Sequence, residues 1–444
     1  MKLKASILFA LRMLKPRSGI KSSAGRSIIG AVFCIGLSLI PLVVVLTVSD
    51  GMIEGITSRI IELSSYHLQA VIRNGSDPSD SVENMMELAS VIKKIPSVTN
   101  AYAERQGIGL VAGAKGRTGA TIRAVPPEIF DTGSTFSKLF SAKEGTVSLS
   151  SNKSALVGVK IAQELNLKVG DTIRLVTFRT GTSGKPVPRI TAFKVEGIVS
   201  SGYQELDALW VFIPFETGFN LLEDSMSSLL VGIQTEDAFA EDLIVTAYEI
   251  EDVLPVGCRL FLWNDLNKAQ YENFASTKMM LIFIMFLIVL VASVNVSSAL
   301  VMLAMERRKE IAILKSLGAS SVGVTTSFLF TGFCTGTLGV ILGLPVGILC
   351  AINVNGIISF IEKIVNIFNR FWYNLTNLFV ATNTDYVTVH LLDPAFYLEK
   401  IPVVLPLPEL LCISIGTIIL SVVVSALPSL KAGSEKPLDT LRKL

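Results

Sequence analysis

Few residues in this sequence are arranged to carry out chemistry. The only histidines, His67 and His390, are far apart and have no cysteine or carboxylate cluster beside them, so a metal site is not indicated. Gly181–Lys185 resembles a phosphate-binding loop only loosely, because Pro186 stands where that loop needs a hydroxyl. We therefore predict no catalytic residue, no metal, no directly bound cofactor and no ATPase activity in this chain.

The charged stretch Met305–Ser320 is the most informative chemical pattern. It reads M-E-R-R-K-E-I-A-I-L-K-S-L-G-A-S. Helical spacing places Ile311, Leu314 and Leu317, with Ile313, in an apolar stripe beside a strongly charged start, and Gly318 stands where such a helix would end. Basic residues at this place could simply fix topology, but an apolar stripe would then have no use in so short a connector.

The elements around that stretch are membrane spans. The chain is 50% hydrophobic with a mean hydropathy of +0.57, too high for a soluble globular protein. Four uncharged apolar stretches approach or exceed the roughly 20 residues that cross a bilayer as a helix. They contain no Asp, Glu, Lys, Arg or His, which argues against an ion-coupled carrier. The predicted spans are 27–48, 279–305, 322–352 and 410–427.

The first span is too long for the apolar region of a signal peptide, and no small-residue cleavage pattern follows it. We interpret it as a retained anchor. Basic residues are concentrated in the amphipathic segment 1–26, the loop 306–321 and the tail 428–444, so these belong in the cytoplasm. Segments 49–278 and 353–409 then lie outside.

The exported region 49–278 shows mixed α and β patterns. A helix is expected at about 80–95, and short β-rich runs separated by Gly/Ser/Pro-rich pieces follow, which indicates an α+β domain of one or two lobes. Helical spacing after span one and before span two predicts stalk helices. Cys258 is the only one of five cysteines outside the spans, so no disulfide framework is possible there. The fold class is an α-helical membrane protein with four transmembrane helices and a large α+β extracytoplasmic domain between the first two.

Span three carries glycines at a regular spacing that would allow close approach of helix backbones, although membrane helices also tolerate glycine generally. These candidate helix-packing residues are Gly332, Gly336, Gly339, Gly343 and Gly347.

Segment 353–409 begins with an amphipathic pattern. Its apolar residues repeat at helical intervals between Ile357 and Trp372, interrupted by residues such as Glu362, Lys363 and Arg370. Such a helix would lie at the outer membrane interface or pack on the exported domain.

The stretch R-R-K-E-I-A-I-L-K-S-L-G-A at 307–319 resembles the hallmark of FtsX-like, MacB-type ABC transporter permeases, which carry it directly after the second span. Val159–Ile173 is similar to a recurrent segment of their exported domain. Tyr397–Val403 (Y-L-E-K-I-P-V) and the size of the exported domain resemble the lipoprotein-releasing LolC/LolE permeases. The 353–396 stretch is longer than is usual in that group.

The resemblance implies an inner-membrane complex of two permeases, copies or paralogues, with a separate cytoplasmic ABC ATPase that binds ATP and Mg²⁺. It implies lipoprotein cargo, whose acyl chains would contact span one, and a periplasmic lipoprotein chaperone. The implied ATPase-coupling residues are Glu306, Arg307, Arg308, Glu310, Ile311, Leu314, Lys315, Leu317 and Gly318. The candidate acyl-chain contacts are Phe33, Leu37, Ile40 and Val44.

Other functions remain open within and beyond this superfamily. A MacB-like efflux permease would act on periplasmic substrates, and an FtsX-like signalling permease would regulate cell-wall hydrolases. A membrane-anchored enzyme is disfavoured by the absence of catalytic motifs, and no nucleic-acid partner is expected.

Overall fold

The computed structural model describes residues 23–72, 81–180, 185–223, 226–240, 242–379 and 401–434. The chain divides into two compact units, which we describe separately. Among the described residues, the helical unit comprises 23–51, 275–379 and 402–434, and the sheet domain comprises 52–274 together with Ile401.

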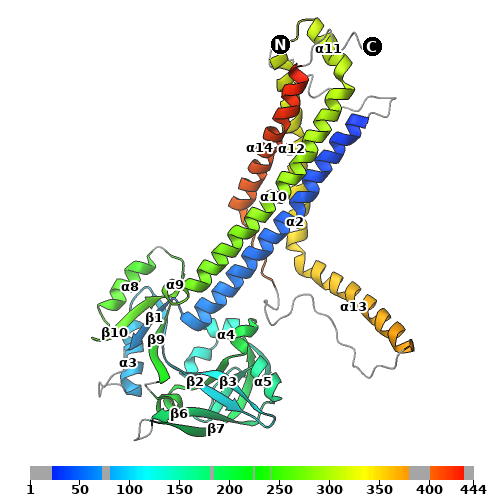
Figure 1. Ribbon diagram of the computed structural model, residues 1–444. Helices are drawn as coiled ribbons and strands as arrows, with labels where there is room; N and C mark the ends of the chain where they lie inside the picture. The colour runs from blue at the N-terminus through cyan, green and yellow to red at the C-terminus, as the bar shows by residue number, and fades with distance from the viewer. Residues whose placement is uncertain are drawn as a thin grey trace. The chain divides into compact units, whose positions relative to one another are not determined.

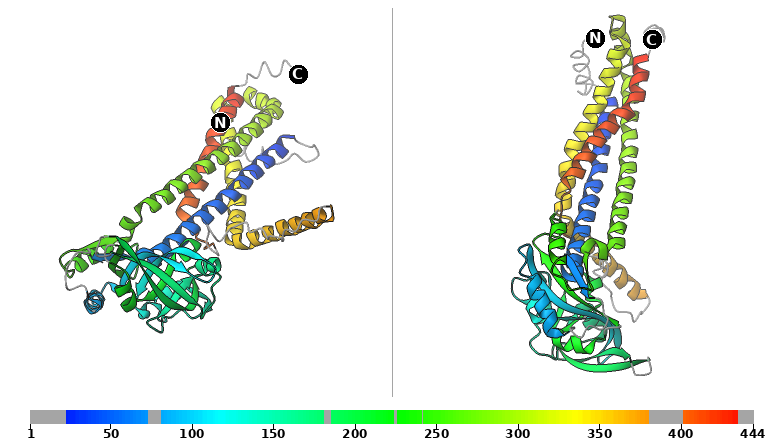
Figure 2. Two further views of the ribbon diagram at one scale, coloured as in Figure 1. Left: turned by 60° about the horizontal axis from the view of Figure 1, so that its bottom comes forward. Right: turned by 90° about the vertical axis from the view of Figure 1, so that its left-hand side faces the viewer.

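Four long helices make up most of the helical unit, and Figures 1 and 2 show them side by side along their lengths. Each is long and apolar enough to cross a membrane, as the hydropathy pattern predicts. A helix suits such segments because all of its backbone hydrogen bonds are made within the segment. The four helices are α2 (Ser23–Ile60), α10 (Lys268–Glu306), α12 (Ser321–Ile352) and α14 (Leu407–Ser434).

Two shorter helices complete the described part of the helical unit. Helix α11 (Arg308–Ser316) follows α10 after Arg307. Helix α13 (Val354–Phe379) follows α12 after Asn353.

The sheet domain is built on one mixed ten-stranded sheet. The order is β10-β1-β9-β2-β3-β8-β5-β7-β4, with β6 pairing β2 and β7. Most pairs are antiparallel, while β3 with β8 and β5 with β7 are parallel. The strands are β1 (Leu68–Ile72), β2 (Val98–Ala112), β3 (Arg117–Val125), β4 (Ser141–Gly145), β5 (Ser154–Gly158), β6 (Thr172–Thr180), β7 (Pro186–Ser200), β8 (Trp210–Pro214), β9 (Ser227–Thr235) and β10 (Cys258–Leu262).

Short helices pack on this sheet and make the domain α+β, the predicted class. Because one sheet runs through the domain, the possible two lobes do not correspond to separate sheets. Two buried clusters form instead, one centred on residues such as Val157 and Ile233 and one rich in aromatic rings such as Phe136 and Phe212. The helices and helical turns are η1 (Ile61–Ser65), α3 (Val82–Ile92), η2 (Pro127–Phe130), α4 (Thr135–Leu139), α5 (Val159–Leu165), α6 (Gln204–Asp207), α7 (Phe215–Leu221), α8 (Leu243–Glu251) and α9 (Trp263–Leu266).

Candidate coupling site and the contacts that connect it

Helix α11 is amphipathic, and the structure divides its predicted apolar stripe between two faces. Ile311 is only 1% exposed and packs in the core of the helical unit, next to the buried Ala312. Lys315 lies on the same side and donates through Nζ to the carbonyl of Gly433 at the end of α14. This face of α11 is therefore occupied by the chain itself.

The opposite face of α11 presents apolar side chains outward. Ile313 is 52% exposed and Leu317 is 80% exposed, and the four-residue spacing puts them on one side of the helix. Leu314 is half-buried at the edge between the two faces. Ile313, which the sequence analysis treated as secondary to Ile311, is thus the better-placed contact residue.

Charged residues at its start and a glycine at its end define the bounds of this segment. Arg307 forms an ion pair with Glu310, with 2.8 Å between Nη1 and Oε1. Gly318 has a φ of +97°, a left-handed conformation that favours glycine, and ends the helix. Glu306 and Arg308 are exposed at the start of the segment. The arrangement places a charged start beside a small exposed apolar patch, which is suited to docking in a groove of a protein partner.

The glycines of α12 lie in contact with two different helices. Cβ atoms built at Gly339, Gly343 and Gly347 would come within 3 Å of α2, the nearest atom at Gly343 being the carbonyl oxygen of Gly36 at 2.6 Å. Those at Gly332 and Gly336 would meet Ser425 and Ser421 of α14. The glycines therefore permit close packing of α12 against α2 at one level and against α14 at another.

The candidate acyl-chain residues lie on the outward side of α2. Phe33 and Leu37 are 69% and 63% exposed, whereas Ile40 and Val44 are half-buried. This side is available to lipid, to an acyl chain or to another helix.

An apolar cavity that no sequence pattern indicates lies elsewhere on α2. About 220 Å³ in volume, it lies between α2, α10 and α14, with Leu46, Met285 and Ile413 among its lining residues. The spacing of apolar residues along one helix cannot indicate a cavity that is lined by three helices.

An ionic cluster beside the ends of three predicted spans was also missed. Lys278 Nζ lies 2.9 Å from Asp50 Oδ1 and 3.2 Å from Glu409 Oε1. It joins residues of α2, α10 and α14 immediately outside the predicted spans. Beside it, Gly51 permits a close approach of the chain, because a Cβ there would lie 1.9 Å from the carbonyl oxygen of Pro402. The cluster fixes the spacing of these three helices where their uncharged spans end.

Within the sheet domain, a buried ion pair fastens the end of helix α2. Arg123 on β3 and Glu104 on β2 are almost fully buried, and Arg123 Nη2 donates to Glu104 Oε2 over 2.8 Å. Arg123 also donates through Nη1 to the carbonyl of Leu63 in the η1 turn that ends this helix. Tyr66 donates its hydroxyl hydrogen bond to Glu104.

The surroundings of Arg123 favour its charged guanidinium. Burial opposes the charge of Arg123, but the adjacent Glu104 carboxylate outweighs that effect and raises the guanidinium pKa above its ordinary value. Burial, together with Glu104, raises the pKa of Tyr66 well above its ordinary value, so its hydroxyl stays protonated. The helix end is therefore held by a charged side chain whose partners are all buried.

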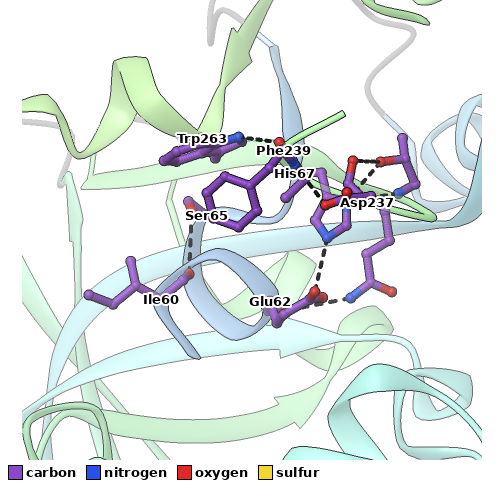
Figure 3. A network of polar contacts seen from close by, with 10 residues as sticks. Ile60, Glu62, Ser65, His67, Asp237, Phe239 and Trp263 are labelled. Carbon is purple, nitrogen blue, oxygen red and sulfur yellow. Dashed lines mark hydrogen bonds and ion pairs between the residues drawn. The ribbon is translucent and has the colours of Figure 1, made fainter. Parts of the chain in front are cut away.

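His67 makes a second connection at the same helix end (Figure 3). The backbone N–H of Thr235 donates to Nδ1 over 3.1 Å, so the ring proton is on Nε2, which donates to Glu62 Oε1 over 3.1 Å. The ring is 2% exposed. Both nitrogens are used to join η1 to the end of β9, which assigns His67 a structural role. His390 lies outside the described residues.

Comparisons with known proteins agree with this two-part organisation. Residues 28–245 match the MacB-like periplasmic core domain, and residues 282–437 match the FtsX-like permease C-terminal family. The chain is 24% identical over 415 residues to the lipoprotein-releasing system transmembrane protein LolC of Neisseria meningitidis, covering 92% of each chain. It is 22% identical to LolE of Haemophilus influenzae over 74% of this chain and 79% of that one.

Among solved structures, the periplasmic region of MacB from Actinobacillus actinomycetemcomitans aligns at 13% identity with a TM-score of 0.30. That alignment covers 48% of this chain and 95% of the MacB chain.

Proposed function

Because the chain is an ABC transporter permease with a MacB-like periplasmic core domain and an FtsX-like permease domain, we propose that it extracts lipoproteins from the outer leaflet of the inner membrane. The observation that carries the proposal is the similarity to lipoprotein-releasing LolC over 92% of both chains. The released lipoprotein would pass to a periplasmic chaperone for delivery toward the outer membrane.

In this proposal a separate cytoplasmic ATPase supplies the energy. It binds ATP and Mg²⁺ and docks on the exposed face of α11, around Ile313 and Leu317. The termini and the 306–321 loop are cytoplasmic, as the positions of the basic clusters favour. Labelling of single cysteines from the outside should reach position 185 in the sheet domain and not position 309 beside α11.

A second permease copy or a paralogue would complete the complex. The exposed side of α2 at Phe33 and Leu37 supports a contact there with lipoprotein acyl chains, because it is uncharged and faces away from the other helices. Mechanical movement of the long helices, rather than a charged pathway through the bilayer, would deliver the work to the exported domain.

The proposal is tested by reconstitution. The purified chain, its cognate ATPase and its partner permease are placed in liposomes with a triacylated lipoprotein, and the lipoprotein transferred to a soluble chaperone is measured with and without ATP. The matched control is the same lipoprotein with its acylated cysteine changed to serine. ATP-dependent release that requires the acyl chains supports the proposal.

Two results would contradict it. Transport of soluble substrates with no dependence on acylation would indicate a MacB-like efflux permease. ATP-dependent activation of a cell-wall hydrolase without any release would indicate an FtsX-like signalling permease.

A further inference from the structure

Helix α13 has two sharply separated faces. At 3.6 residues per turn, every large apolar side chain of Val354–Tyr373 lies on roughly one half of the helix circumference. The polar and charged side chains lie on the other half. Phe360, Ile367 and Phe368 on the apolar half are each more than 60% exposed. A helix that packs on a protein core usually needs a narrower apolar stripe.

The chain order places α13 beside the membrane. Helix α12 ends at Ile352, and only Asn353 separates it from the start of α13. A helix that begins one residue after a membrane span begins at the bilayer surface. Figure 1 and both views of Figure 2 show α13 running away from α12 rather than back along the four long helices.

The polar face determines what kind of surface fits. Glu362, Lys363 and Arg370 give it a net charge of only +1 (two basic residues minus one acidic residue), so attraction to anionic headgroups is weak. The apolar face is rich in Phe and Ile and carries Trp372, a residue type enriched at the boundary between headgroups and acyl chains. The apolar face must therefore supply most of the binding.

We propose that α13 lies in the plane of the outer leaflet, with its apolar half immersed below the headgroups and its polar half in water. The occupant of the apolar face is the lipid of the same membrane that α12 crosses. Parallel immersion would hold the outer end of α12 at a fixed depth while other helices move. This inference is independent of which cargo the permease handles.

Spin labels on single cysteines test the proposal in the full chain. The five native cysteines are replaced by serine, and the variants are reconstituted in vesicles of phosphatidylethanolamine and phosphatidylglycerol. Collision with oxygen, which dissolves in lipid, is compared with collision with a water-soluble nickel chelate. The labelled variants are Ile361→Cys, Ile364→Cys and Phe368→Cys on the apolar face, and Lys363→Cys, Asn366→Cys and Arg370→Cys on the polar face.

The expected result is a helical periodicity. Labels on the apolar face should collide several-fold more with oxygen than with the nickel chelate, and labels on the polar face should show the reverse. Positions 361 and 368, almost two turns apart, should report the same depth. The contrast should persist in vesicles of a zwitterionic lipid alone, because the polar face contributes little charge attraction.

Three results would overturn the proposal. Exclusion of both reagents from the apolar face would mean that protein covers it, either the sheet domain or a second copy. Access of the nickel chelate to all six positions would mean that the helix lies in water. A steady increase in depth from 361 to 368 would mean that the helix enters the bilayer at an angle.

A paired substitution provides an independent readout. Phe368→Asp should place a charge in the leaflet and shift the label at position 361 toward nickel access, whereas Asn366→Asp on the polar face should leave that label unchanged. Equal effects of the two substitutions would contradict lipid immersion of the apolar face.

Discussion

The apolar patch on α11 makes a quantitative prediction about ATPase docking. Truncating its two exposed members together, Ile313→Ala with Leu317→Ala, should weaken binding of the ATPase. Complete burial of a side chain of this size contributes about 1.5–3 kcal/mol. Leu317 is 80% exposed and Ile313 is 52% exposed. Docking can therefore gain most of the burial free energy of Leu317 and about half of that of Ile313.

The expected loss for the double variant is therefore about 2–4 kcal/mol, which corresponds to roughly 30- to 1,000-fold weaker binding. The assay is titration of the purified ATPase onto the permease in nanodiscs, alongside co-purification from membranes at equal expression. Leu317→Asp should have a larger effect, because docking would bury a charge without a partner.

Ile311→Ala is the matched control from the same helix. Ile311 is buried against the chain's own core, so its truncation should lower the free energy of unfolding of the permease by about 2–5 kcal/mol. It should affect ATPase binding only through that loss of stability. The contrary result would be wild-type ATPase affinity in the Ile313/Leu317 variant and weakened binding in Ile311→Ala. The ATPase would then dock on the Ile311 side of α11, and the proposed docking face would be wrong.

Three other contacts yield further predictions. Lys278→Met should lower the free energy of unfolding by about 1–3 kcal/mol, because it leaves two carboxylates without their shared donor. Lys278→Arg keeps a donor and should be tolerated. Arg123→Met should lower the free energy of unfolding of the sheet domain by about 3–5 kcal/mol, because it leaves the buried Glu104 without its partner. Adding Glu104→Leu should recover most of that loss, as measured by thermal unfolding of the full chain. If the second substitution recovered nothing, the loss would not come from an unpaired buried charge. Gly343→Leu should lower the melting temperature in detergent by separating α12 from α2, whereas Gly416→Ala, where a Cβ has open space, should not.

The elements of this fold were predictable where the signal is local. Charge-free apolar runs predict the four long helices, and β-rich runs such as 98–103 and 172–178 fall within β2 and β6. These signals are carried by neighbouring residues, and hydrophobic burial acts on them directly. Helix α2 continues to Ile60, well past the apolar run that ends at residue 48, and helical spacing predicts a stalk helix in that stretch.

The packing of the candidate coupling segment was not predictable from periodicity alone. Periodicity places Ile311, Leu314 and Leu317 in one stripe, yet Ile311 packs inward and Leu317 faces outward. The difference arises because Ile311 packs in a cluster with residues from other helices, such as Phe328 of α12 and Ala432 of α14, which lie elsewhere in the sequence. A pattern of hydrophobicity shows which residues seek burial and does not show which partner buries them.

The same limit explains why the polar contacts were missed. Asp50, Lys278 and Glu409 are ordinary charged residues at the ends of apolar runs, and each alone indicates only the edge of a span. Arg123 and Glu104 stand on neighbouring strands whose register no local pattern gives. Ion pairs between distant segments depend on the assembled fold, so they become visible only in the structure.

These missed contacts bear directly on how an ABC permease of this kind could work. The predicted spans contain no Asp, Glu, Lys, Arg or His, which argues against a proton relay or a charged substrate path across the bilayer. In the proposed mechanism the helices themselves move, which requires contacts that hold them beyond the predicted spans. Asp50 in α2 is held by Lys278, and the carbonyl of Leu63 at the end of the same continuous helical stretch is held by Arg123. A stretch fastened at both places can transmit a displacement that begins at α11, and loosening either contact should uncouple ATP hydrolysis from release while leaving ATPase docking intact.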